Sequence, residues 1–274
     1  MEKFVLTKEH TYSGSLILVT PDFSLKKEPE IWEMKSVFKE TGTGGSSEDM
    51  KRSTLRPTPG QPDVLLRKEV VNALLRLLAD IGCKEEIAAV SGFRTQQEQQ
   101  EIWNDSMKQN GEAFTRKFVA VPGHSEHQSG YAIDLAENGE EIDFICPKFP
   151  NFGIFQKFRE RMADFGFVER YVSGKEMITG IGIEPWHFRY VGYPHSVIMA
   201  DRGITLEEYI GFLRKETGWG YPYIFRDGAD WIEISCLSLE NGQERVLEMP
   251  DTAVYQVSGT NEGCAVVSVW RKNA

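Results

Sequence analysis

The chain has 274 residues, which is enough for one large domain or for a domain with a small appendage. Hydrophobic residues make up 41% of it and charged residues 26%, a balance that excludes a disordered or fibrous class. The formal net charge of -10, with no basic stripe in the sequence, argues against nucleic acid as a partner.

The cysteines and the N-terminal sequence indicate the cellular compartment in which the protein is expected. The four cysteines are scattered without a C-x-x-C pair, so we expect buried thiols, with one bridge between Cys236 and Cys264 as the alternative. The N-terminal sequence lacks a signal peptide's apolar run, and no stretch reaches the roughly 18 apolar residues that span a bilayer. As written, the chain is expected to be cytoplasmic with no membrane span; a chain that had lost its leader would look the same and would act outside the cytoplasm.

The N-terminal third predicts a strand, a loop and a helix. The β-branched run over residues 15–19, closed by Thr20 and Pro21, predicts an early buried strand. Residues 40–62 are rich in Gly, Ser, Thr and Pro and predict an exposed, mobile loop. From Asp63, apolar residues recur at steps of three and four until Gly82, which predicts a helix with one buried face.

The middle of the chain mixes helices and strands. Residues 87–90 predict a strand, and Thr95 with Glu98 has the spacing of a capping box, so a helix is expected to begin just after Arg94. The other elements predicted here are helices over 154–164 and 205–216 and strands over 167–172 and around 187–191. Because these do not alternate strictly as βαβ units, the sequence favours an α+β fold.

The C-terminal part has a different texture. Past Gly218, strand-like runs at residues 231–237, 254–257 and 265–270 are separated by turn signals that include Asn241-Gly242. We therefore predict a main domain over residues 1–217 and a small accessory β-rich unit over residues 218–274. A unit this small is marginally stable alone.

Two of the five histidines stand in polar contexts that contain carboxylates. His127 precedes Asp134 within one segment, and Glu184 precedes His187 within another. Two imidazoles and one carboxylate make a three-ligand zinc site that leaves a position open for water. On a regular strand, residues 127 and 134 would face opposite ways, so a bend at Gly130 is required. From these residues alone, ordinary polar loop histidines remain the alternative.

Arg94 is a further candidate, between a predicted strand and a helix N-terminus. A guanidinium at such a place can bind a substrate carboxylate through two hydrogen bonds or stabilise a tetrahedral oxyanion. A surface salt bridge is the alternative.

At these residues the chain resembles a known family. The pattern S-x-H-x-x-G-x-A-x-D is met by Ser125, His127, Gly130, Ala132 and Asp134, and E-x-W-H is met by Glu184, Trp186 and His187. With Ser91-Gly-Phe-Arg94-Thr upstream, the three ordered motifs resemble the VanY-like D-alanyl-D-alanine carboxypeptidases and their VanX and VanXY relatives. The resemblance covers residues 12 to 215 approximately.

The resemblance implies a fold and a function. It implies the α+β fold shared with the hedgehog signalling domain, and a zinc metallopeptidase that removes D-alanine from D-Ala-D-Ala ends of peptidoglycan precursors, the target of glycopeptide antibiotics. A carboxypeptidase, a dipeptidase or both would fit. With the same zinc site, an L,D-carboxypeptidase or L-Ala-D-Glu endopeptidase is the alternative. A non-catalytic, zinc-containing wall-binding module is a third hypothesis.

The resemblance also implies roles for individual residues. His127, Asp134 and His187 would bind Zn²⁺, and Glu184 would be the base that activates the zinc-bound water. Arg94 would polarise the scissile carbonyl or stabilise the oxyanion. Ser125 and Gln99 would bind the ends of the peptide.

Overall fold

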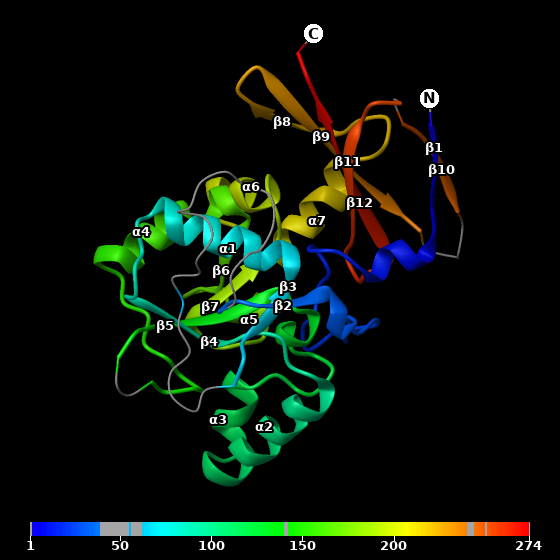
Figure 1. Ribbon diagram of the computed structural model, residues 1–274. Helices are drawn as coiled ribbons and strands as arrows, with labels where there is room; N and C mark the ends of the chain where they lie inside the picture. Colours follow the sequence, from blue (N-terminus) through cyan, green and yellow to red (C-terminus); the bar gives the residue numbers. More distant parts are fainter. Residues whose placement is uncertain are drawn as a thin grey trace. The chain divides into compact units, whose positions relative to one another are not determined.

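The computed structural model describes residues 2–38, 55, 62–139, 142–239, 244–249 and 251–273. The chain forms two compact units (Figure 1). The larger unit contains Thr20–Ser24 and Glu28–Arg202, and the smaller unit contains Met1–Val19, Leu25–Lys27 and Gly203–Ala274. No helix among the described residues is long and apolar enough to cross a membrane.

A four-stranded antiparallel sheet organises the larger unit, with strand order β4-β5-β7-β6. Its strands are β4 (Ile87–Ser91), β5 (Ala132–Glu137), β6 (Phe167–Tyr171) and β7 (Glu184–Tyr190). A separate two-stranded ribbon pairs β2 (Met34–Ser36) with β3 (Leu65–Arg67). Of the predicted metal residues, Asp134 lies on the central strand β5 and His187 on the central strand β7, whereas His127 precedes β5.

Helices flank this sheet. They are α1 (Lys68–Asp80), α2 (Gln96–Gln109), α3 (Glu112–Phe118), α4 (Gly153–Arg161), α5 (Glu176–Thr179) and α6 (His195–Arg202), with 3-10 turns η2 (Ile31–Glu33), η4 (Glu126–Ser129) and η5 (Met162–Phe165). In Figure 1, α1 and α4 lie on one side of the sheet, and α2 and α3 lie on the other. The buried face of α1 packs with α4 and the sheet into one hydrophobic core.

Aromatic rings dominate that core. Phe149, Phe158 and Phe188 contact one another in edge-to-face geometry, with ring centroids 4.9 to 5.6 Å apart. Phe158 on α4 and Phe188 on β7 are both fully buried. Edge-to-face pairs add stabilisation beyond the area they bury, so this cluster fixes β7 against the helical layer.

The smaller unit is built mainly from strands. It contains β1 (Glu2–Leu6), β8 (Tyr223–Asp227), β9 (Asp230–Ser238), β10 (Arg245–Met249), β11 (Val254–Gly259) and β12 (Cys264–Arg271), with η1 (Lys8–Tyr12) and α7 (Leu206–Glu216). The antiparallel sheet has the order β11-β12-β9-β8, and β1 pairs with β10. The N-terminal strand therefore belongs to the same unit as the C-terminal strands.

Most predicted elements are confirmed, including both capping boxes, in which Thr95 and Thr205 accept from the backbone of Glu98 and Glu208. The predicted strand over residues 15–19 was wrong. The segment is buried, but its backbone bonds to side chains and isolated carbonyls rather than to a strand: Leu16 N donates to Ser258 Oγ, and Leu18 N donates to Thr260 O.

The division of the chain differs from the predicted boundary between residues 217 and 218. Helix α7 packs with the strands of the smaller unit, where Cys236 N donates to Thr217 Oγ1, and β1 joins β10. Such pairing between distant parts of the sequence leaves no local signal. The predicted loop over residues 40–62 and the Asn241-Gly242 turn lie outside the described residues, apart from Leu55 and Pro62. All four cysteines lie among the described residues, and none of them forms a disulfide bond, so the alternative of a bridge between Cys236 and Cys264 is not met.

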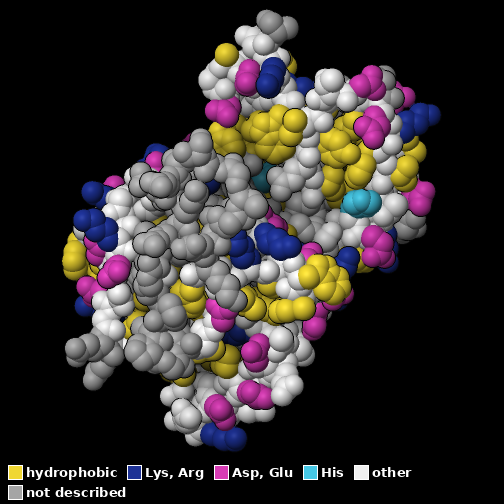
Figure 2. Space-filling view, in the orientation of Figure 1, with side chains coloured by type: hydrophobic (Ala, Val, Ile, Leu, Met, Phe, Trp, Pro, Cys, Tyr) yellow, Lys and Arg dark blue, Asp and Glu magenta, His cyan; other side chains and the backbone are white. Residues whose placement is uncertain are grey.

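Charge is dispersed over the face of the molecule that Figure 2 displays. Basic and acidic side chains are intermingled there among the described residues, without a large area of one sign. A binding site must therefore be sought in local chemistry rather than in a surface field.

Phe158→Ala is expected to lower the free energy of unfolding by about 3–5 kcal/mol, because it leaves a cavity among buried rings. Phe152→Ala is the matched control, since that ring is 63% exposed; its effect should stay within about 0.5 kcal/mol. Urea unfolding followed by circular dichroism measures both. Equal effects would show that the ring cluster does not stabilise the unit.

Candidate active site

Two neighbouring strands bring the carboxylate and the second histidine together. Asp134 on β5 lies directly opposite His187 on β7 in the antiparallel register. On its other side, Asp134 lies opposite Ser91 of β4, where a bulge makes a step of two residues on β4 face a step of one on β5. Asp134 is thus central in the sheet and buried.

His127 reaches the same place from the turn before β5. It lies in η4, and Gly130 ends that turn in the left-handed region with φ 75° and ψ 10°. A Cβ at Gly130 would lie 2.9 Å from Met34 Cε, the flexible end of a side chain that can move, so it is the left-handed conformation that favours glycine here. The bend predicted at Gly130 is confirmed.

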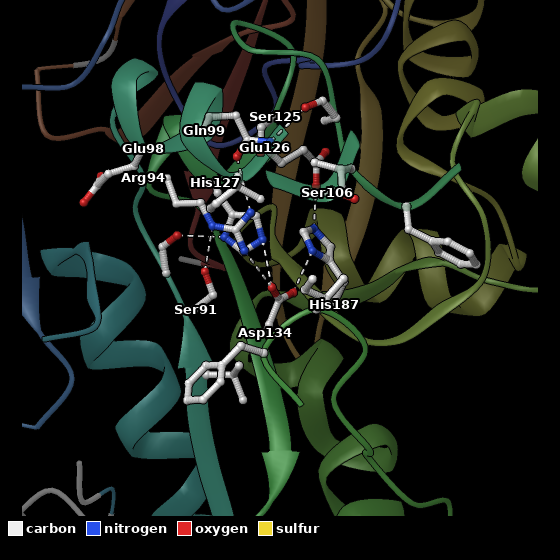
Figure 3. Close-up of a pocket in the computed structure, with 18 of the residues that line it drawn as sticks. Ser91, Arg94, Glu98, Gln99, Ser106, Ser125, Glu126, His127, Asp134 and His187 are labelled. Carbon is white, nitrogen blue, oxygen red and sulfur yellow. Dashed lines mark hydrogen bonds and ion pairs between the residues drawn. The ribbon is translucent and has the colours of Figure 1, made fainter. Parts of the chain in front are cut away.

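The three side chains form a group that can hold a metal ion, with one donor atom from each lying within 4.8 Å of the others. His127 Nε2 lies 3.1 Å from Asp134 Oδ2, and His187 Nδ1 lies 2.9 Å from Asp134 Oδ1. In Figure 3 the Asp134 carboxylate lies between the two imidazoles. Two imidazoles and a carboxylate, all buried, fit the donor set of a catalytic zinc ion.

The His127 ring is oriented from behind by the backbone. Its Nδ1 lies 2.7 Å from the carbonyl oxygen of Gly92, which can only accept a hydrogen bond. The proton therefore sits on Nδ1 and the lone pair of Nε2 faces the metal group. A hydrogen bond on the outer nitrogen is the usual way in which a ligand histidine is fixed.

Glu184 lies beside the group without belonging to it. It begins β7, where the step from Glu184 to Phe188 faces the shorter step from Tyr171 to Glu169 on β6. This irregularity lets Glu184 and His187 approach each other, with Oε2 3.8 Å from Nδ1. Burial raises the pKa of Glu184 to about 8, although the nearby His187 lowers it.

The pKa values of Asp134, His127 and His187 are also shifted, and in each of them burial is opposed by a neighbouring group. The pKa of Asp134 lies far below its usual range, because His127 and His187 outweigh the effect of burial. Burial lowers the pKa of His127, and Arg94 lowers it further. Burial also lowers the pKa of His187, but its hydrogen bonds to Asp134 and Glu126 prevail and raise it to about 9.

Arg94 points into the same group. Its Nη2 lies 3.3 Å from Asp134 Oδ2, its Nε donates to Ser91 Oγ at 2.8 Å, and its Nη1 donates to Gln99 Oε1 at 3.3 Å (Figure 3). The Gln99 amide also donates from Nε2 to the carbonyl of Ala120 at 2.8 Å. Gln99 therefore links Arg94 to the pocket wall; its predicted contact with substrate stays a prediction.

These residues line one pocket of about 570 Å³, together with Ser125. Apolar walls come from several elements: Val64, Phe93, Ile102, Phe118, Phe144, Ile145, Tyr171, Ile181 and Trp186. The volume lies within the range of small-molecule sites, and the pattern of apolar walls with a few convergent polar groups is typical of them.

Sequence reasoning missed Glu126, which lies between Ser125 and His127 in the first motif. Its Oε1 accepts from Arg170 Nε at 2.8 Å and lies 2.9 Å from Arg189 Nη1, while its Oε2 lies 3.2 Å from His187 Nε2. Both arginines stand in the predicted strands directly before a tyrosine, Tyr171 or Tyr190, and an arginine that is buried in a sheet needs an anionic partner. These two arginines were the signal in the sequence that a buried acid is needed, but only the fold shows that this acid is Glu126.

Comparisons with known proteins identify relatives of this chain. A family model described as VanY, D-alanyl-D-alanine carboxypeptidase, matches residues 63–193. The chain is 46% identical over 152 residues to the bifunctional D-Ala-D-Ala dipeptidase and carboxypeptidase VanXYC of Enterococcus gallinarum, a match that covers 55% of this chain and 80% of that one.

Solved structures of D,D-peptidases also match this chain. The vancomycin resistance D,D-dipeptidase VanXYg, in complex with a D-Ala-D-Ala phosphinate analogue, matches with a TM-score of 0.87 at 39% identity, over 98% of this chain and 99% of that one. A mutant of the D,D-pentapeptidase VanY from a VanB-type resistance cassette, in complex with Zn(II), matches with a TM-score of 0.51 at 27% identity, over 72% of this chain and 98% of that one.

The first of these structural matches extends over both units, and the sequence match to VanXYC exceeds what a shared fold alone requires. The chain therefore belongs to the VanY family of D-alanyl-D-alanine carboxypeptidases.

Proposed function

We propose that the protein is a zinc-dependent D,D-peptidase that hydrolyses the terminal D-Ala-D-Ala bond of peptidoglycan precursor peptides. The observation that carries this proposal is the convergence of His127, Asp134 and His187 on one point, with Glu184 3.8 Å from a metal-facing nitrogen. The similarity to VanXYC and VanXYg supports the D-Ala-D-Ala specificity.

His127 Nε2, Asp134 and His187 Nδ1 are the groups that would hold zinc. Their donor atoms already lie close together, and the outer nitrogen of each imidazole is engaged by another acceptor. Bound zinc supplies Lewis acidity, which makes water more acidic and a carbonyl carbon more electrophilic. The Zn(II) complex of the VanY relative supports this choice of metal.

Glu184 is the proton carrier in this proposal. Its carboxylate takes a proton from the attacking water and then delivers it to the leaving amine of D-alanine, which would otherwise depart as an amide anion. A raised pKa suits this cycle, because the carboxyl group must gain and lose a proton near neutral pH.

Arg94 supplies positive charge where the scissile carbonyl gains negative charge. Ser91 and Gln99 accept hydrogen bonds from its guanidinium, so the guanidinium is already in position before the reaction. Ser125 lines the pocket and is proposed to bind one end of the peptide. Stereochemistry depends on the pocket walls rather than on metal and base, so an L,D-carboxypeptidase stays the alternative. A cytoplasmic location also stays a prediction.

The test of the reaction is release of free D-alanine by the zinc-loaded protein from the D-Ala-D-Ala dipeptide and from a pentapeptide precursor. Release from both establishes a bifunctional enzyme, and release from the pentapeptide alone establishes a carboxypeptidase. Release from an L,D-peptide alone would replace the proposal by the L,D alternative.

Glu184→Gln is expected to lower kcat by roughly 10²- to 10⁴-fold, because the amide keeps the shape of the side chain but cannot accept the proton. Zinc content should be unchanged, since Glu184 is not a ligand. Glu101→Gln is the matched control, an exposed carboxylate at the pocket rim, and should leave kcat unchanged. Full activity of Glu184→Gln, or loss of its zinc, would contradict the assigned role.

His127→Ala and His187→Ala are each expected to abolish stoichiometric zinc binding, because two remaining ligands hold zinc weakly. His124→Ala is the control: this histidine lies in the same loop, but its Nδ1 contacts the carbonyl of Thr20 instead of the metal group. Atomic emission after dialysis measures the metal. One zinc per chain in the two ligand variants would remove these residues from the site.

A further inference from the structure

Glu126 contacts His187 on the side of the ring opposite to the metal group. His187 Nδ1 faces Asp134 Oδ1 at 2.9 Å, and His187 Nε2 faces Glu126 Oε2 at 3.2 Å. Figure 3 shows these two contacts at the two nitrogens of one imidazole. An ionised carboxylate only accepts hydrogen bonds. Each carboxylate therefore favours a proton on the nitrogen that it faces. A metal ion held by Asp134 and His187 would replace the proton on Nδ1, whereas Glu126 would keep the proton on Nε2.

The Glu126 carboxylate is itself fixed and kept ionised. Arg170 on β6 and Arg189 on β7 both contact Oε1, at 2.8 and 2.9 Å. All three side chains are almost entirely shielded from solvent, with exposures of 0% to 1%. Both guanidiniums contact Oε1, and the imidazole contacts Oε2.

The two histidines of the metal group are consequently held in different ways. The outer nitrogen of His127 meets a neutral backbone carbonyl, that of Gly92, whereas the outer nitrogen of His187 meets a charged side chain. A carboxylate at this position makes the imidazole a more basic ligand. It also lies between the metal group and two buried cations.

We propose that Glu126 is a positioning residue that fixes the His187 ring with its proton on Nε2 and its lone pair on Nδ1, and thereby sets the affinity for zinc. This inference rests on the proposed metal site. The competing explanation is that Glu126 only compensates the charges of Arg170 and Arg189.

The wild-type protein gives the first test, which needs no variant to fold. Heteronuclear NMR of the histidine rings in the zinc-loaded protein should show His187 protonated on Nε2 with Nδ1 bound to metal. His127 should show the reverse pattern, protonated on Nδ1. A His187 ring bound through Nε2 would overturn the inference while leaving the zinc site itself intact.

The second test measures zinc affinity by competition with a chromophoric chelator. Glu126→Gln should weaken zinc binding by roughly 10- to 100-fold. Glu126→Asp keeps the charge beside both arginines but withdraws it from His187, so it should fold and still bind zinc more weakly than the wild type does.

Glu169→Gln is the matched control for these variants. Glu169 is also a largely buried carboxylate paired with an arginine, Arg159, at 2.8 Å, and it touches no residue of the metal group in the described structure. Its zinc affinity should equal that of the wild type. Unchanged affinity in folded Glu126→Gln or Glu126→Asp would reduce Glu126 to a compensating charge. A wild type that binds no zinc would instead refute the proposed function.

Discussion

Burial of charge is the constraint on which the site depends. Three carboxylates, of Glu126, Asp134 and Glu184, are buried in one part of the larger unit. An ionised carboxylate removed from water is costly unless opposite charge and hydrogen bonds replace the lost hydration. Arg170 and Arg189 provide that charge for Glu126, and the two histidines with Arg94 provide it for Asp134. Glu184 has a weaker approach, 3.8 Å from His187. The unequal compensation gives the three acids different properties.

Irregularities of the sheet, rather than its regular pleat, position these charged side chains next to one another. A bulge in β4 sets Ser91 against Asp134, and the extra residues of β7 bring Glu184 towards His187. A regular strand would alternate the side chains of residues three apart between its two faces. Bulges are common next to active sites because they redirect a side chain without interrupting the sheet. The hydrophobic core behind β7 holds the strand in this shape.

How much of this could be predicted depends on whether the signal was local. The helix that buries Val70, Leu74 and Leu77 and the caps at Thr95 and Thr205 follow from periodicity and short-range hydrogen bonds, so the sequence predicts them. Two motifs and a bend at Gly130 made the metal group one hypothesis beside ordinary loop histidines, and the resemblance to the VanY-like family implied the ligand set. The pairing of β1 with β10 and the contact of Glu126 with His187 join distant segments, and nothing in either local sequence specifies the partner.

His187 lies between two carboxylates in different environments, since its Nε2 faces Glu126 at 3.2 Å and its Nδ1 lies 3.8 Å from Glu184. Glu126, matched by two guanidiniums, has a pKa well below its usual range despite burial and keeps its negative charge. Glu184 is buried with only a 3.8 Å approach to His187, and its pKa is raised to about 8. Environments that separate the pKa values of two acids in this way assign them different roles. An acid that keeps its charge can orient a ligand, and an acid near its pKa can exchange a proton. In the proposed mechanism, exchanging the two environments would leave the His187 ring without a fixed acceptor and the substrate without a base.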